Sequence, residues 1–356
     1  MDRRTFLTTG VVATAAVAGG TSAQAQPAGP APEGSHRLRM ATIWRDDVEG
    51  PADQAGRFAA SVSAALGPKV AISVSFDDDA LKSFGAGAFG GGQADLLHVS
   101  GGWLSSAFGA EHAYFTGLPL GGASPRDLTQ SWLQAGGGQD LWDAFSATLG
   151  FKPLLVGHLG ARPMLWSRRP IATPGDLTGL KVHAEGLAGD ILTGLGARRI
   201  AMSDTRVATA LADGDLDAAL VGGALTAAAS GVPKVAPHAL EIDLDPAGPA
   251  LVVAIRLAAW HGLGSQGQAV LTALACEAYA RGVAETRATE PLIRKSLSDW
   301  RGVAIRPAPP VLTEAVHRVR DGVIAGLAAS SPLAARLDRS LMAFAAFSAD
   351  DHRPIG

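Results

Sequence analysis

The sequence almost lacks cysteine. Cys276 is the single cysteine among 356 residues, so no disulfide can form within the chain. It ends an apolar run, Leu271–Cys276, which favours a buried structural thiol over a reactive one. The fold must therefore be stable through its hydrophobic core alone, and a 47% share of hydrophobic residues is ample for that core.

Charged residues are also scarce, and the sequence contains no basic block and no alternation of basic and aromatic residues. Lys, Arg, Asp and Glu together make up 18% of the chain, and the net charge is −3. Nucleic acid is therefore not an expected partner. A membrane-spanning helix needs about 20 strongly apolar residues. The uncharged stretch Leu257–Cys276 contains His261, two glutamines and three glycines, so it does not qualify.

Catalytic motifs are absent as well: there is no H-E-x-x-H, no G-x-S-x-G and no cluster of Cys and His. Gly85–Gly90 fits G-x-G-x-x-G, but it ends a predicted helix instead of following a strand. We therefore expect neither an enzyme nor a bound cofactor, and an exported enzyme that uses this glycine loop is the less favoured interpretation.

The first residues of the chain have a pattern typical of an export signal. Residues 2–7 (Asp-Arg-Arg-Thr-Phe-Leu) read as a twin-arginine motif, and a weakly apolar stretch follows. Ala23-Gln24-Ala25 offers the small residues that a signal peptidase needs. We predict a signal peptide over residues 1–25, a disordered Pro/Gly/Ala tether over 26–36, and a periplasmic location reached by the twin-arginine pathway.

The remainder alternates between strand-like and helix-like segments of about ten residues, a pattern that predicts α/β lobes with mainly parallel sheets. The length exceeds one typical domain, so we predict two lobes with a cleft, a venus-flytrap architecture with a helical C-terminus. The first lobe is predicted to hold residues 37–153 plus 246–290. The second is predicted to hold 154–245 plus 291–347 with the C-terminal helices.

Residues 152–220 carry the most information about a site. A strand over Leu180–His183 is followed at once by a helix over Leu187–Leu195, so the helix N-terminus and His183 lie where α/β sheets bind anions. Arg162, beside another strand end, could add a bidentate contact to a carboxylate. Without a ligand role, Arg162 would be a surface or ion-paired arginine, and His183 would be a strand-end histidine whose hydrogen bonds are already satisfied.

The same region resembles a known family. Residues 169–183 (Arg-Pro-Ile-Ala-Thr-Pro-Gly-Asp-Leu-Thr-Gly-Leu-Lys-Val-His) and 210–217 (Ala-Leu-Ala-Asp-Gly-Asp-Leu-Asp) are similar to the hallmark of TRAP (tripartite ATP-independent periplasmic) solute-binding proteins. Weaker matches, among them Tyr114–Gly121 and Ser340–Phe344, resemble the subgroup for 2-oxo acids and related monocarboxylates. The resemblance implies a receptor that delivers a small organic acid to the small and large TRAP membrane subunits.

Several positions depart from the family's pattern. His183 stands where the family has its ligand arginine, Arg162 where the subgroup has a metal-binding glutamine, and Leu220 and Val221 where it has an acidic metal ligand and a tryptophan. These replacements remove oxygen ligands and add a positive charge, so we predict no metal ion. Arg162 is then expected to be the main anion clamp, with His183 as a neutral or partly charged donor.

Three further positions are candidates for the pocket wall. Trp103 and Trp166 could contact ligand or belong to the core, and His98 could face the cleft or bond to the backbone. The same fold would also suit a periplasmic binding module that serves a sensor or another type of importer. Because Leu312–Phe347 is apolar and the subgroup's C-terminal helices often support dimers, a homodimer through these helices is possible.

Overall fold

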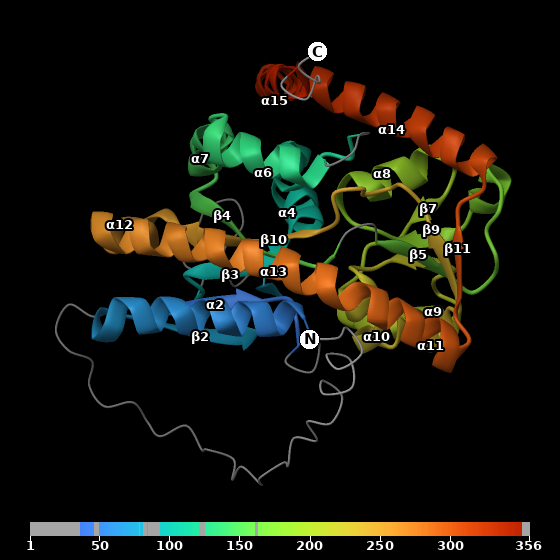
Figure 1. Ribbon diagram of the computed structural model, residues 1–356, viewed down its shortest axis with the longest axis horizontal. Helices are drawn as coiled ribbons and strands as arrows, with labels where there is room; N and C mark the ends of the chain where they lie inside the picture. Colours follow the sequence, from blue (N-terminus) through green and yellow to red (C-terminus); the bar gives the residue numbers. More distant parts are fainter. Residues whose placement is uncertain are drawn as a thin grey trace, which may run out of the picture. The chain divides into compact units, whose positions relative to one another are not determined.

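The structure, a computed structural model, describes residues 36–45, 50–77, 79–80, 84, 93–120, 125–160 and 163–350. Within this part of the chain, two β-sheets are each flanked by helices (Figure 1). The predicted signal peptide, the tether up to residue 35 and the Gly85–Gly90 loop lie outside the described residues. Among the described helices, none is both long and apolar enough to cross a membrane.

The first sheet has the strand order β2-β1-β3-β10-β4. β1 pairs in parallel with β2 and β3, whereas β10 is antiparallel to both β3 and β4. We call this sheet and its helices the first lobe. Its elements are β1 (His36–Thr42), α2 (Pro51–Leu66), β2 (Val70–Phe76), β3 (Leu96–Ser100), α4 (Gly101–Phe108), α5 (Ala113–Thr116), α6 (Pro125–Ala135), α7 (Gly138–Thr148), β4 (Phe151–His158), β10 (Ala250–Arg256) and α12 (Leu257–Gly262).

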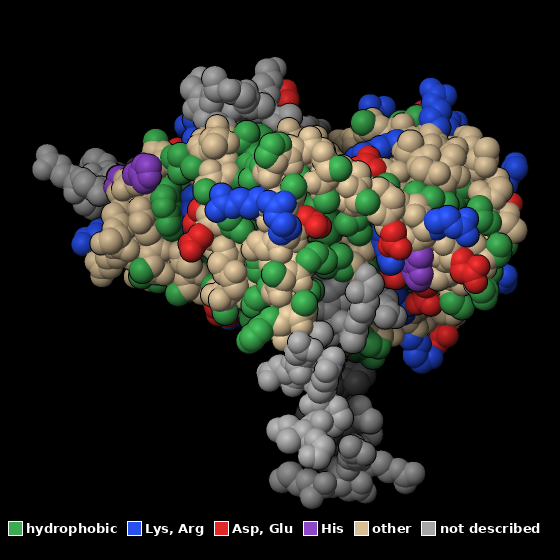
Figure 2. Space-filling model, turned by 90° about the horizontal axis from the view of Figure 1, so that it is seen from above, with side chains coloured by type: hydrophobic (Ala, Val, Ile, Leu, Met, Phe, Trp, Pro, Cys, Tyr) green, Lys and Arg blue, Asp and Glu red, His purple; other side chains and the backbone are tan. Residues whose placement is uncertain are grey.

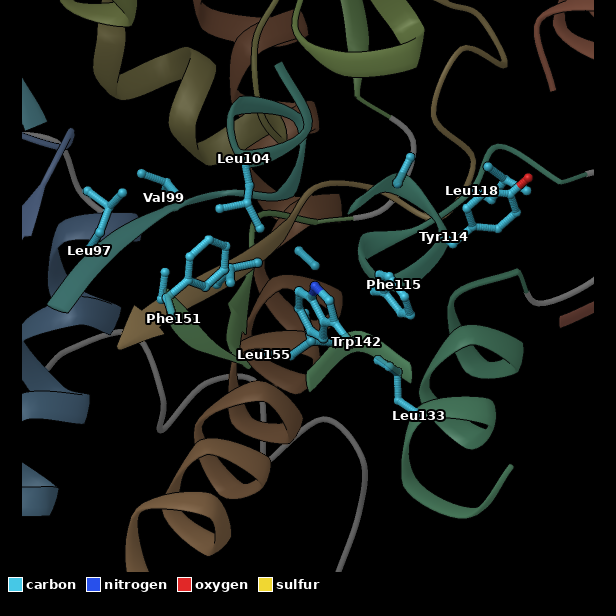
Figure 3. Close-up of a cluster of buried hydrophobic side chains, with 14 of the residues drawn as sticks. Leu97, Val99, Leu104, Tyr114, Phe115, Leu118, Leu133, Trp142, Phe151 and Leu155 are labelled. Carbon is cyan, nitrogen blue, oxygen red and sulfur yellow. The ribbon is translucent and has the colours of Figure 1, made fainter. Parts of the chain in front are cut away.

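Strand β10 explains how a continuous apolar run forms a central strand. Successive side chains of a strand point to opposite faces. Leu251, Val253 and Ile255 accordingly join the hydrophobic cluster on the face that α2 covers. Val252 and Ala254 join the aromatic-rich cluster on the other face, part of which Figure 3 shows around Trp142 and Phe151. Both faces are covered, so every position in the strand interior is buried.

The second sheet has the order β11-β9-β5-β8-β6-β7 and, with its helices, forms the second lobe. β5 is antiparallel to both of its neighbours, β8 and β9, while the outer pairings are parallel. Its elements are β5 (Met164–Ser167), β6 (Lys181–His183), α8 (Gly186–Gly194), β7 (Arg198–Arg199), α9 (Asp204–Asp213), β8 (Ala218–Leu220), α10 (Ala224–Ser230), α11 (Val232–Val235), β9 (His238–Glu241) and β11 (Ala304–Pro307).

The chain passes between the two lobes after β4, after β9 and along helix α13 (Gly264–Arg301). α13 packs against α2 and β4 of the first lobe and against α10 and α11 of the second (Figure 1). The sequence predicts a break before Pro291, yet the helix continues through this residue. Proline removes one intrahelical hydrogen bond, and the packing of α13 on both lobes offsets that loss.

The C-terminal helices α14 (Pro310–Ser330) and α15 (Pro332–Asp350) divide between the lobes. α14 packs on α8, whereas α15 packs on α5, α6 and α7 of the first lobe, with Leu337 and Leu341 in the same cluster as Trp132. The predicted boundary between residues 153 and 154 falls inside β4, which pairs as a whole with β10. Cys276, expected to be buried, is partly exposed.

Candidate functional site

A cavity of about 60 Å³ lies between the lobes, where strands β3, β6 and β8 end. Trp44, Ser100 and Gly102 form its first-lobe wall. Glu185, on the connection from β6 to α8, and Leu220, at the end of β8, belong to its second-lobe wall. Ligands of open α/β sheets bind beyond the carboxyl ends of strands, so this cavity is the candidate site.

The lobes touch directly beside this cavity, through the starts of helices α4 and α8. A Cβ atom on Gly186 would lie 3.1 Å from the Cα atom of Gly102, and Gly186 also has φ +53°, a conformation that favours glycine. The amide of Gly186 donates to Ser106 Oγ at 3.0 Å, and Arg199 donates to the same hydroxyl at 3.0 Å. The predicted anion-binding amides of α8 thus include one that is already bonded across the lobe contact.

Ser100 forms a second bond across the gap. Its hydroxyl caps helix α4 by accepting from the Trp103 amide at 3.0 Å, and it donates to Glu185 Oε2 at 2.6 Å. One serine therefore fixes both the start of a first-lobe helix and the position of a second-lobe carboxylate. The lobes are closed on each other at this point.

His183 is held within its own lobe. Its Nε2 lies 3.0 Å from Asp204 Oδ1 and its Nδ1 lies 3.3 Å from the carbonyl oxygen of Ile200. Burial lowers the pKa of His183, but the hydrogen bond and charge of Asp204 outweigh burial, and the pKa is raised. Because both ring nitrogens face acceptors, the ring is best described as an imidazolium paired with Asp204.

Two carboxyl groups in the cavity wall hold protons unusually well. Burial raises the pKa of Glu185 to about 7, and the neighbouring charge of Asp204 adds to this effect. Burial also raises the pKa of Asp245 to about 7, even though the amide of Gly248 donates to its carboxylate at 3.1 Å. Both groups therefore change charge near neutral pH.

The predicted site residues take different places. Leu220 and Val221 line the cavity. His183 is only 4% exposed and is not among the lining residues, although its partner Asp204 is. Arg162 lies outside the described residues, next in sequence to Pro163, which lines the cavity.

The remaining three predicted residues pack in the lobes. Trp166 is fully buried in the second-lobe core between β8 and β9, and Trp103 packs against the aromatic cluster of the first lobe. His98 is fully buried, with Nδ1 3.3 Å from Thr42 Oγ1, and burial lowers its pKa to about 3. None of the three is among the described residues that line the cavity.

Sequence reasoning missed the acidic residues of the wall, Glu185, Asp204 and Asp245, as well as Trp44. One signal was available for Glu185, because it follows His183 by two positions at a strand end whose location was predicted. No comparable signal existed for Asp245, which reaches the cavity from the connection between β9 and β10.

Two α/β lobes that meet around a cavity at their strand ends are an arrangement typical of periplasmic binding proteins. A family model described as "Bacterial extracellular solute-binding protein, family 7" matches residues 86–329, and the chain belongs to this family. The resemblance to TRAP solute-binding proteins is thereby confirmed.

Known proteins agree with this assignment. A monocarboxylate 2-oxoacid-binding periplasmic protein of Nostoc sp. is 28% identical over 166 residues, which cover 47% of this chain and 45% of that protein. The match thus spans less than half of the curated relative.

Solved structures confirm the predicted two-lobe α/β fold with its helical C-terminus. A TRAP solute-binding protein from Bordetella bronchiseptica, with calcium and picolinate, has a TM-score of 0.80 at 22% identity over 89% of this chain and 93% of its own. One from Colwellia psychrerythraea, with calcium and pyruvate, has a TM-score of 0.76 at 23% identity over 87% and 94%. A Bordetella pertussis receptor binding pyroglutamic acid has a TM-score of 0.71 at 17% identity over 86% and 100%.

The calcium ions of two of these structures raise the question of a metal here. Calcium needs six to eight oxygen ligands. Among the described residues, no group of three or more His, Cys, Asp and Glu side chains could hold a metal ion. The hydrocarbon side chains of Leu220 and Val221 occupy the end of β8 in the wall, and Asp204 is paired with His183. The described residues do not fit a calcium site, and the absence of a metal stays a prediction.

Proposed function

We propose that this protein is the periplasmic receptor of a TRAP-type transporter. It binds a small organic carboxylate between its lobes and delivers it to the small and large membrane subunits. The family assignment and the carboxylates named for the similar structures support this proposal. Export by the twin-arginine pathway is the part of the proposal that rests on the sequence of residues 1–25 alone.

The observation that carries the proposal is the cavity between the lobes. Its wall combines apolar side chains, such as Leu220 and Val221, with a few polar groups, which is the composition of a small-molecule site. Arg162 precedes the wall residue Pro163 and is the proposed anion clamp. Closure of the two lobes on the solute then creates the form that the membrane subunits recognise.

A thermal-shift screen against a carboxylate library tests this proposal. A solute at about 100 times its dissociation constant stabilises the native state by about 2.7 kcal/mol. Titration calorimetry on the best solute should then show that Arg162→Ala weakens binding by roughly tenfold or more, the loss of one charge-assisted contact. Arg318→Ala, at an exposed position on α14, is the matched control and should leave affinity unchanged. No stabilisation by any carboxylate, or equal affinities for the two variants, would contradict the proposal.

The variant His183→Ala distinguishes the role of His183 from the role proposed for Arg162. The histidine ring is engaged by Asp204 and Ile200, so we expect a loss of stability but a smaller loss of affinity than for Arg162→Ala. A larger loss of affinity than for Arg162→Ala would place the anion clamp at His183.

Competing roles are distinguished by simple observations. We propose that the chain is a receptor and not an enzyme. A sensor module of the same fold would bind solute without associating with TRAP membrane subunits in a co-purification.

The proposed homodimer would use α14 and α15, where Phe347 is 76% exposed, and sedimentation velocity measures the oligomeric state. Because α15 already packs on the first lobe, a dimer would have to use the outer faces of these helices.

A further inference from the structure

The cavity wall has an unexpected charge for a receptor of anions. Three carboxylates, from Glu185, Asp204 and Asp245, line the cavity, and no Lys or Arg does so among the described residues. The cation His183 is paired with Asp204, with 3.0 Å between His183 Nε2 and Asp204 Oδ1. Arg199 lies behind the wall, where it donates to Asp190 and Ser106.

The imidazolium of His183 pairs with Asp204, so Glu185 and Asp245 are the wall carboxyl groups without a paired cation, and a solute that carries only a carboxylate would bring a further negative charge beside them. Like charges a few Å apart in a partly buried site repel strongly, so the excess must be removed by proton uptake or by a positive group on the solute. A positive group on the solute would supply the cation that an ionised Glu185 lacks among the described lining residues.

The polar atoms of the wall fit a solute that offers both a hydrogen-bond donor and a hydrogen-bond acceptor. Glu185 accepts from Ser100 through Oε2, and its Oε1 has no hydrogen-bond partner among the described residues. On the first-lobe wall, the buried indole N–H of Trp44, a side chain that is 4% exposed, also has no partner among these residues. An unpaired buried donor is costly because it has lost its hydrogen bond to water, so a solute that offers Trp44 an acceptor gains affinity.

We propose that the solute of this receptor carries a protonated nitrogen next to its carboxylate, as an amino acid does, and that Glu185 selects for that nitrogen. This inference rests on the proposed function. The ammonium group places a positive charge between the solute carboxylate and Glu185. Glu185 is the specificity-determining residue because it lies at the lobe contact and is fixed there by Ser100.

Matched pairs of solutes test the proposal. L-Alanine against pyruvate, L-valine against 2-oxoisovalerate, and L-proline against pyroglutamate share a carbon skeleton and a carboxylate, and only the first member of each pair has a protonated nitrogen. We expect at least one amino member to stabilise the protein in thermal-shift and calorimetric titrations at pH 7.5, and its partner to bind roughly tenfold more weakly or worse. Preference for the 2-oxo or lactam member in every pair that binds would overturn this proposal but leave the carboxylate receptor intact. Failure of all the solutes, together with the wider carboxylate library, would overturn both.

The pH dependence of binding supplies a second readout. An ammonium group needs ionised Glu185, so the affinity of wild type should rise between pH 6 and pH 8. Asp204, His183 and Arg199 act electrostatically on Glu185, and Asp245, whose pKa burial also raises to about 7, lines the same cavity; all four are present in both wild type and the Glu185→Gln variant. Glu185→Gln keeps the hydrogen bond from Ser100 but should weaken binding of the amino member roughly tenfold and flatten the pH profile. Asp213→Asn, at an exposed position of α9, is the control. If the affinity of wild type instead falls as the pH rises, the protein takes up a proton when it binds the solute carboxylate. That result would refute the proposal.

Discussion

Replacement of Glu185 by Gln should change how the stability of the ligand-free protein depends on pH. Burial raises the pKa of Glu185 in the folded state to about 7, from an ordinary value of 4.5. The folded state therefore binds more protons than the unfolded state between these two pH values. Its stability falls as the pH rises through this window, and the contribution of the protonated group is fully present only below the unfolded value.

The size of the effect follows from the two pKa values. Without screening, the difference between 4.5 and about 7 corresponds to about 3 kcal/mol. Glu185 borders a cavity and is partly exposed, so solvent screening reduces the expected figure to about 1–2 kcal/mol. At pH 8, Glu185→Gln should therefore be more stable than wild type by about 1–2 kcal/mol, because glutamine carries no charge to bury.

Denaturant unfolding of both proteins from pH 5 to pH 8 measures this difference. The free energies of unfolding should converge at pH 5 and separate at pH 8, whereas Asp213→Asn should follow wild type throughout. Asp245 and His183 both contribute a fall in stability with rising pH, so the comparison between variants, not the wild-type curve alone, carries the test. If the free energies of unfolding of wild type and Glu185→Gln changed in parallel with pH, the claim that burial raises the pKa of Glu185 would be refuted.

Four other substitutions have clear expected outcomes. Gly186→Ala and Gly231→Ala both force alanine into positive φ, and each should lower stability by about 1 kcal/mol. Only the former faces the other lobe, so calorimetry should show weaker solute binding for Gly186→Ala alone; equal affinities would mean that this lobe contact is not needed for binding. Asp204→Asn leaves the buried His183 without its ion pair, so the melting temperature should fall and the pKa of the ring, followed by NMR, should drop; an unchanged ring pKa would contradict the ion pair. Trp132→Ala empties a fully buried position and should cost about 3–5 kcal/mol in denaturant unfolding; a loss below about 1 kcal/mol would mean that the aromatic cluster is not tightly packed.

The sequence predicts the architecture well where periodicity is strong. The apolar run Ala250–Ile255 and the alternation in Val70–Phe76 each predict the observed strand, because burial on two faces or one face leaves a distinct pattern. Short strands leave too little pattern, so β9 and β11 were not predicted. The pair Gly101-Gly102 suggests a loop but begins helix α4. A Cβ on Gly101 would lie 2.3 Å from Thr116, so close packing and not flexibility accounts for this glycine.

The site is less predictable than the fold, because its chemistry depends on which side chains meet across the lobes. His183 was expected to contact the solute, but Asp204, 21 positions later, pairs with it. Burial raises the pKa of Glu185, whereas the hydrogen bond from Ser100 of the other lobe, 85 positions earlier, lowers it. Both contacts join residues that are far apart in the sequence, so local spacing cannot reveal them. Both bring acidic side chains to the site, whereas the basic residues at 162 and 183 suggest a positively charged one.

Blocking the cavity tests the central claim that solute binds between the lobes. Leu220→Trp places an indole in the wall of a cavity of about 60 Å³, and Val311→Trp adds the same side chain at a position on α14 that is 54% exposed. Figure 2 shows that on the face in view hydrophobic side chains are interspersed with charged side chains and other surface atoms. Calorimetric titration of the best solute from the screen should show binding by the Val311 variant and none by the Leu220 variant, with both variants folded. Equal affinity in the two variants would contradict a site in this cavity.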